Sequence, residues 1–81
     1  MTIENVRNAG SIGTYEGIPF YSSKRGLIRK GVTVYRITDE PIAYTSAFRV
    51  REVLYRKGLE SYLLMSKVTR GLYDIFLVGK E

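Results

Sequence analysis

Hydrophobic and polar positions alternate along several short segments of the chain, with the period of two residues that is typical of β-strands. These segments are rich in β-branched and aromatic residues, and Gly, Pro, Asp or Ser bound them. The five predicted strands are IPFY (18–21), VTVYRI (32–37), PIAY (41–44), LESYLLMS (59–66) and LYDIFLVG (72–79). We therefore expect one layer of sheet in the fold.

Residues 46–57 have the period of an α-helix instead. Thr45 or Ser46 can cap the first turn, and Gly58 suits the left-handed conformation that follows many helices. The apolar stripe of the predicted helix is Ala47, Val50, Val53 and Leu54. This helix would pack its stripe against the sheet.

Two stretches of the chain resemble each other: FYSSKRGLIRKGVTVYRI (20–37) and AYTSAFRVREVLYRKGLESYLL (43–64). In each, a Tyr precedes a Ser, a basic segment ends in Arg-Lys-Gly, and another Tyr follows. The second stretch is longer by about one helical turn, so the pair predicts a duplicated strand, helix and strand unit. The first helix then covers residues 23–30, although Gly26 interrupts it and a loop fits equally.

The predicted order of elements is strand, helix, strand, strand, helix and strand, with an extra strand at the C-terminus. This order indicates an α+β fold of the ferredoxin-like βαββαβ type, in which two helices cover one face of a small antiparallel sheet. The 81 residues suit a single domain. We expect residues 1–13 to form an N-terminal arm, in which Thr2 to Ala9 adopt either a short helix or an extended segment.

The other face of such a sheet is open. Side chains along LESYLLMS alternate between the two faces of the sheet, and the matching positions of the first stretch follow the same alternation. Two tyrosines and two aliphatic side chains are therefore predicted to share this open face. The four residues are Tyr35, Ile37, Tyr62 and Leu64. We expect the face to pack against a second copy of the protein, to lie under the N-terminal arm, or to bind a ligand.

The chain is basic, with 13 Lys and Arg against 8 Asp and Glu and a formal charge of +5. This balance favours an anionic partner such as nucleic acid. The candidate cations form two clusters, which would merge into one basic face if the two helices lie side by side: Lys24, Arg25, Arg29 and Lys30, and Arg49, Arg51, Arg56 and Lys57. Such a face contacts phosphates without reading sequence. A solvated helix surface carries the same residues, and Arg51 is more simply explained as a snorkelling side chain.

Catalysis and metal binding have little support in the sequence. The chain has neither His nor Cys, which are the commonest general base and the strongest nucleophile. Asp39 and Glu40 are the only adjacent carboxylates, and they suit a turn; no loop has the carboxylate spacing of a metal site. We therefore expect a protein that is not an enzyme and that carries no metal and no cofactor.

The expected location is the cytoplasm, or the host cytoplasm for a viral protein. No segment approaches the roughly 20 apolar residues that span a bilayer, and MTIENVRNAG lacks an apolar signal segment. The chain has no His, Trp, Gln or Cys but is rich in Lys, Arg, Tyr and Ile, a bias that resembles proteins of thermophiles.

Several features of the second half occur together in one known family. They are the stripe with Ala47, Val50 and Leu54, the Lys57-Gly58 end of the helix, Tyr62, and GLYDIFLVG at 71–79. In these features residues 46–79 resemble half of a sporulation-related repeat (SPOR) domain. The resemblance implies a duplicated ferredoxin-like plan and peptidoglycan binding. The RNA-recognition motif shares this plan and stacks bases on its open sheet face, but its Lys-Gly-Phe-x-Phe signature is absent here.

Two functions fit the sequence. The first is a small basic protein that binds nucleic acid through a Lys/Arg helical face. The alternative is a protein interaction or structural module that forms a homodimer through the open sheet face. A viral accessory protein fits either description.

Overall fold

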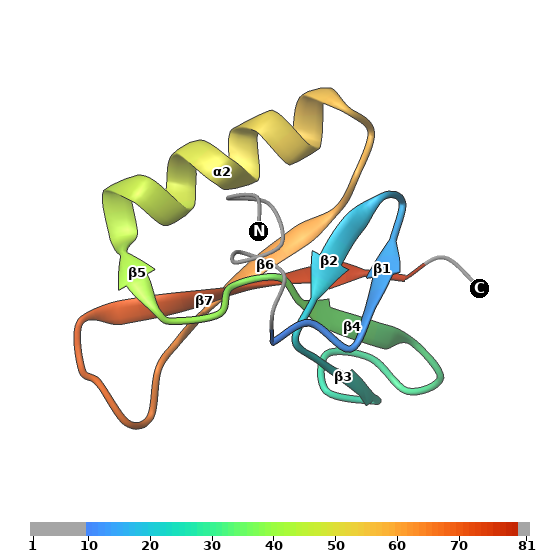
Figure 1. Cartoon of the computed structure of the whole chain (residues 1–81), viewed down its shortest axis with the longest axis horizontal. Helices are drawn as coiled ribbons and strands as arrows, with labels where there is room; N and C mark the ends of the chain where they lie inside the picture. Colours follow the sequence, from blue (N-terminus) through green and yellow to red (C-terminus); the bar gives the residue numbers. More distant parts are fainter. Residues whose placement is uncertain (1–9, 80–81) are drawn as a thin grey trace.

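The computed structural model describes residues 10–79, which form seven strands and one helix (Figure 1). The strands are β1 (Gly13–Tyr15), β2 (Ile18–Phe20), β3 (Ser22–Arg25), β4 (Thr33–Arg36), β5 (Ile42–Ala43), β6 (Ser61–Met65) and β7 (Leu72–Val78). The helix is α2 (Tyr44–Arg56). Within these residues no helix has the length and apolarity needed to cross a membrane.

Strand β7 is the centre of the main sheet, in which all pairings are antiparallel. It pairs with β4 and then β5 along one edge and with β6 along the other, and β3 lies outside β4. A strand with neighbours on both edges is largely shielded from water, which suits the apolar sequence LYDIFLV. Strands β1 and β2 form a separate two-stranded hairpin.

The core lies on one side of the main sheet. Ala47 and Leu54, two turns apart on α2, pack against Ile75 and Leu77 of β7. The β1–β2 hairpin lies on the same side, next to α2 (Figure 1), and its Tyr15 ring stacks on Tyr35 at 4.6 Å between centroids. The helix and the hairpin together therefore cover this face. We call the opposite face of the main sheet the far face.

The prediction of two helices on one face of the sheet is wrong. Residues 23–30 form most of β3 and a loop, and the described residues contain a single helix. Gly26 and Gly31 adopt φ angles of 81° and 82°, which lie in the left-handed region and interrupt a right-handed helix. Ser and Gly are weak helix formers, whereas strand β3 gains a full set of partners along the edge of β4.

The duplicated unit is also absent, because the two similar stretches fold differently. The first forms a β-hairpin, and the second forms α2 followed by β6. The structural counterpart of the β3–β4 loop is instead the β6–β7 loop. The loops end in Lys30-Gly31 and Arg70-Gly71, with glycine φ angles of 82° and 83°. In both loops, the amide of the residue after the glycine donates a hydrogen bond to a carbonyl three residues before it: Val32 to Arg29 at 3.2 Å, and Leu72 to Thr69 at 3.3 Å. A cation followed by glycine therefore ends both loops.

The other predicted elements are confirmed. The five predicted strands correspond to β2, β4, β5, β6 and β7, and the predicted helix corresponds to α2. The N-cap residue of α2 is Ala43, not Thr45 or Ser46, and Ala43 makes no side-chain cap. Gly58 has the expected left-handed conformation, with φ at 79°. Residues 1–9 of the predicted arm lie outside the described residues.

Candidate nucleic-acid interface

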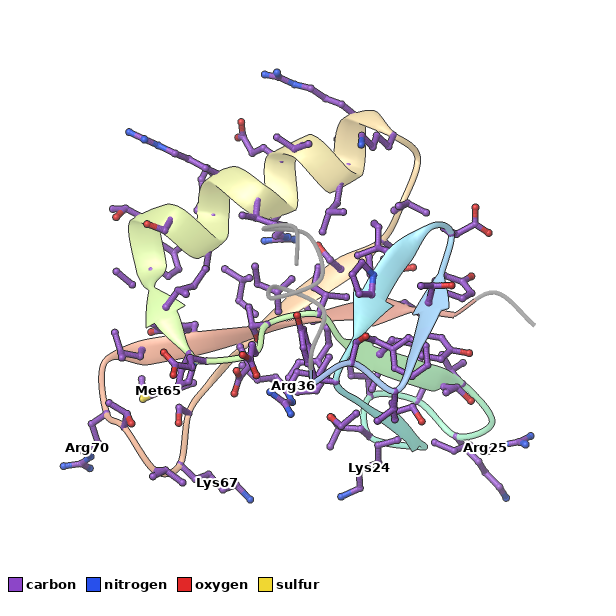
Figure 2. The ribbon with its side chains drawn as sticks, viewed as in Figure 1. Lys24, Arg25, Arg36, Met65, Lys67 and Arg70 are labelled. Atoms are coloured by element: carbon purple, nitrogen blue, oxygen red, sulfur yellow. The ribbon has the colours of Figure 1, made fainter. Side chains whose placement is uncertain are left out.

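The predicted cations do not form one helical face. Those of the first cluster lie on β3 and the β3–β4 loop, and those of the second lie on α2 and directly after it. Figure 2 shows Lys24 pointing away from α2, below the sheet. The structure therefore separates Lys24, Arg25, Arg29 and Lys30 from Arg49, Arg51, Arg56 and Lys57.

Arg29 makes the only ion pair in the part of the chain that the structure describes. Its Nη2 lies 3.5 Å from Oε2 of Glu60, next to the start of β6, and both side chains are about half exposed. The β3–β4 loop therefore extends from β4 past β7 to the start of β6. Val34 of β4 and Val78 of β7 are paired in the sheet, and both are buried. An exposed pair contributes at most about 1 kcal/mol, so Arg29 remains available to a stronger anionic partner.

The four side chains predicted to share an open face lie on opposite faces of the sheet. Residues that pair across antiparallel strands share a face. Tyr35 pairs with Leu77, which pairs with Ser61, and this row belongs to the core side. Ile37 also packs against the core, whereas Tyr62 and Leu64 lie on the far face. The prediction of a shared face is wrong because it depends on the repeat, and the two similar stretches fold differently.

The far face carries a row of three side chains that the sequence did not indicate as a group. Arg36 of β4, Phe76 of β7 and Tyr62 of β6 are consecutive partners across the sheet, and all three are partly exposed. Arg36 is held in place, because its Nε donates to Ser22 Oγ at 3.0 Å and its Nη1 donates to the Thr38 carbonyl at 2.6 Å. Arg36 is thus fixed next to Phe76, and Phe76 is the cross-strand neighbour of Tyr62.

Further cations extend this side of the molecule at both of its ends. Lys24 projects from β3, and Lys67 and Arg70 project from the β6–β7 loop, all away from α2 (Figure 2). Arg36 lies between them in the same view, and Arg25 lies beside Lys24. We call Lys24, Arg36, Tyr62, Lys67, Arg70 and Phe76 the far-face site.

The β6–β7 loop that carries Lys67 and Arg70 has its own internal support. Ser66 Oγ accepts hydrogen bonds from the amides of Val68 and Thr69, at 3.2 and 3.1 Å. The amide of Ser66 donates to the Leu72 carbonyl at 2.8 Å, which closes the base of the loop. The two cations therefore project from a loop whose backbone is hydrogen-bonded, which limits the entropy lost when a ligand binds.

The carboxylates nearest these cations make other contacts or are exposed, and Glu60 pairs with Arg29. Asp74, on the far face, accepts a hydrogen bond from Thr38 Oγ1 at 2.8 Å, and Asp39 and Glu40 are exposed in the segment between β4 and β5. Among residues 10–79, neither Lys24, Lys67 nor Arg70 pairs with a carboxylate. The six side chains of the far-face site are therefore four cations and two aromatic rings, and Lys24, Lys67 and Arg70 have no carboxylate partner among residues 10–79.

No group of three or more His, Cys, Asp or Glu side chains among residues 10–79 could hold a metal ion. Comparisons with protein families, with curated proteins and with solved structures find no match to this chain. The resemblance to a sporulation-related repeat domain therefore stays a prediction.

Proposed function

We propose that this protein is a non-catalytic nucleic-acid-binding protein whose contact surface is the far-face site. The observation that carries the proposal is the row of Arg36, Phe76 and Tyr62 across the sheet, with unpaired Lys24 on β3, next to β4, and unpaired Lys67 and Arg70 in the β6–β7 loop. Cations attract phosphates at any sequence, and aromatic side chains on a sheet offer surfaces on which bases stack.

The arrangement favours single strands. Stacking on Phe76 and Tyr62 requires a base whose face is free, and the bases of a duplex are already stacked on one another. Each base stacked on an aromatic side chain contributes roughly 1 to 3 kcal/mol. Lys24 at one end, and Lys67 and Arg70 at the other, would then hold the phosphates on either side of the stacked bases. An intracellular location fits this function.

Binding and its dependence on salt test the proposal. A fluorescently labelled single-stranded oligonucleotide should bind the protein, and its affinity should fall as salt rises, because each phosphate contact releases counterions. For three or four contacts, the affinity should fall roughly 20- to 50-fold between about 50 and 200 mM salt. Fluorescence anisotropy measures this directly. A duplex of the same sequence should bind more weakly. The absence of binding to DNA and RNA at low salt would refute the function.

A further inference from the structure

The two edges of the main sheet differ in chemistry. Strand β3 forms one edge and β6 forms the other, and within the described residues no strand pairs with the outer side of either. Soluble proteins protect exposed edges with charges, prolines or bulges, since an unprotected edge accepts a further strand. Strand β3, with the sequence SSKR, carries two cations. Strand β6, with the sequence SYLLM, has no such protection, and its five residues pair with β7 without a bulge.

The hydrogen-bond pattern shows which backbone groups of β6 face outward. The amide of Val78 donates to the Glu60 carbonyl at 3.0 Å, and the amide of Ser66 donates to the Leu72 carbonyl at 2.8 Å. Hydrogen-bonded pairs alternate along an antiparallel ladder, so the even-numbered residues of β6 bond to β7. The backbone groups of Ser61, Leu63 and Met65 therefore point to the free edge.

The surface beside this edge carries exposed apolar and aromatic side chains and has a hollow at one end. Met65, at the end of β6, is 54% exposed, and Tyr55 of α2 is 79% exposed. At the start of β6, a shallow hollow of about 400 Å³ lies between the strand and α2. Its lining residues are Arg51, Tyr55, Gly58, Leu59, Glu60 and Ser61. The hydroxyl of Ser61 is buried there without a hydrogen-bond partner. The exposed Met65 side chain and the hollow thus lie at opposite ends of β6.

We propose that β6 pairs with β6 of a second copy of this chain, antiparallel and around a two-fold axis at Leu63. This register opposes Ser61 of one copy to Met65 of the other, so each exposed Met65 would fill the hollow beside the other copy's small Ser61. It also brings Lys67 of one copy near Glu60 of the other, at both ends of the interface, where the half-exposed Glu60 side chain already contacts Arg29 of its own copy. A two-fold interface requires a surface that is complementary to itself. Here Met65 of each copy fits the hollow of the other, and Lys67 of each copy lies near Glu60 of the other. A second copy is therefore the occupant that this edge fits.

The pairing has a geometric consequence for the rest of the surface. Two antiparallel strands related by a two-fold axis keep the same face of their sheets on the same side. Both copies of α2 would lie on one side of the joined sheet, and the two far-face sites would continue across the other side. The inference does not depend on nucleic-acid binding, because it stands on the edge of β6 alone.

Met65→Lys tests the interface, because an edge lysine is a natural block to strand pairing. Sedimentation equilibrium between about 1 µM and 1 mM should show the natural chain passing from one mass to twice the 9.3 kDa of a single chain. Met65→Lys should raise the dissociation constant about tenfold or more. The matched control is Val68→Lys, which adds the same charge at a position that is 95% exposed in the β6–β7 loop. That control should dimerise as the natural chain does.

Hydrogen exchange at single amides identifies the contact. The Leu63 amide points to the free edge and should become protected only at concentrations where the dimer forms, whereas the Leu64 amide, bonded to β7, should be protected throughout. A monomer at every concentration would overturn the proposal. A dimer in which the Leu63 amide still exchanges freely would place the interface elsewhere and overturn it equally.

Discussion

The double variant Lys67→Glu, Arg70→Glu is expected to bind single-stranded nucleic acid roughly 100-fold more weakly than the natural chain at low salt. The variant removes two phosphate contacts and places two anions where phosphates would lie. The slope of log affinity against log salt should also become shallower by about 1.4, because each single-strand phosphate contact accounts for about 0.7. Both side chains are exposed, so circular dichroism should show an unchanged fold.

The matched control for this variant is Arg49→Glu, Arg56→Glu on α2. It makes the same change in net charge, also at exposed positions, but on the side of the sheet that carries the helix. We expect its affinity to stay within a few-fold of the natural chain, since only the general attraction of the net charge is reduced. Equal losses from the two double variants, measured by fluorescence anisotropy, would contradict a localised site.

Leu77→Ala is expected to cost about 2 to 5 kcal/mol of the free energy of unfolding. Leu77 is fully buried in the central strand and belongs to the same core cluster as Ala47, Leu54 and Ile75. Its truncation removes apolar contacts on several sides and leaves a cavity. A domain of 81 residues has little stability to spare, so the midpoint of thermal unfolding should fall by roughly 8 to 40 °C, at about 4 to 8 °C per kcal/mol.

Leu64→Ala is the control for this core prediction. The substitution is chemically identical, but Leu64 lies on the far face and is 37% exposed. Because less surface is removed from a buried setting, we expect a cost of about 1 kcal/mol or less. Circular dichroism during heating and during urea unfolding gives both values. Similar losses from the two variants would mean that the core does not lie between α2 and β7.

The sequence predicts the elements whose signal is local. The alternation of side chains in LYDIFLVG and LESYLLMS reflects their positions in the sheet, and the apolar stripe of residues 46–57 reflects one face of α2 packed on β7. The sequence predicts a helix at residues 23–30 because their basic pattern, which ends in glycine, resembles the end of α2. The same pattern ends a β-hairpin loop when the glycine adopts a positive φ, as Gly31 does.

The far-face site was only partly predictable, because its members come together through strand register. Lys24 and Tyr62 were among the predicted site residues, but Arg36, Phe76, Lys67 and Arg70 were not. Arg36 and Phe76 are 40 positions apart in the chain and become neighbours only because β4 pairs with β7. No local pattern encodes that pairing. To predict the far-face site from the sequence, one would need to know which strands pair with β7.

The most direct test of the proposed function is a titration of the isotopically labelled protein with a single-stranded oligonucleotide, followed by two-dimensional NMR. We expect the largest shifts at the amides and side chains of the far-face site, at Tyr62, Phe76, Lys67 and Arg70. The solvent-facing positions Arg49 and Arg56 of α2 should change little. Shifts confined to α2, or no shifts at low salt, would contradict the account.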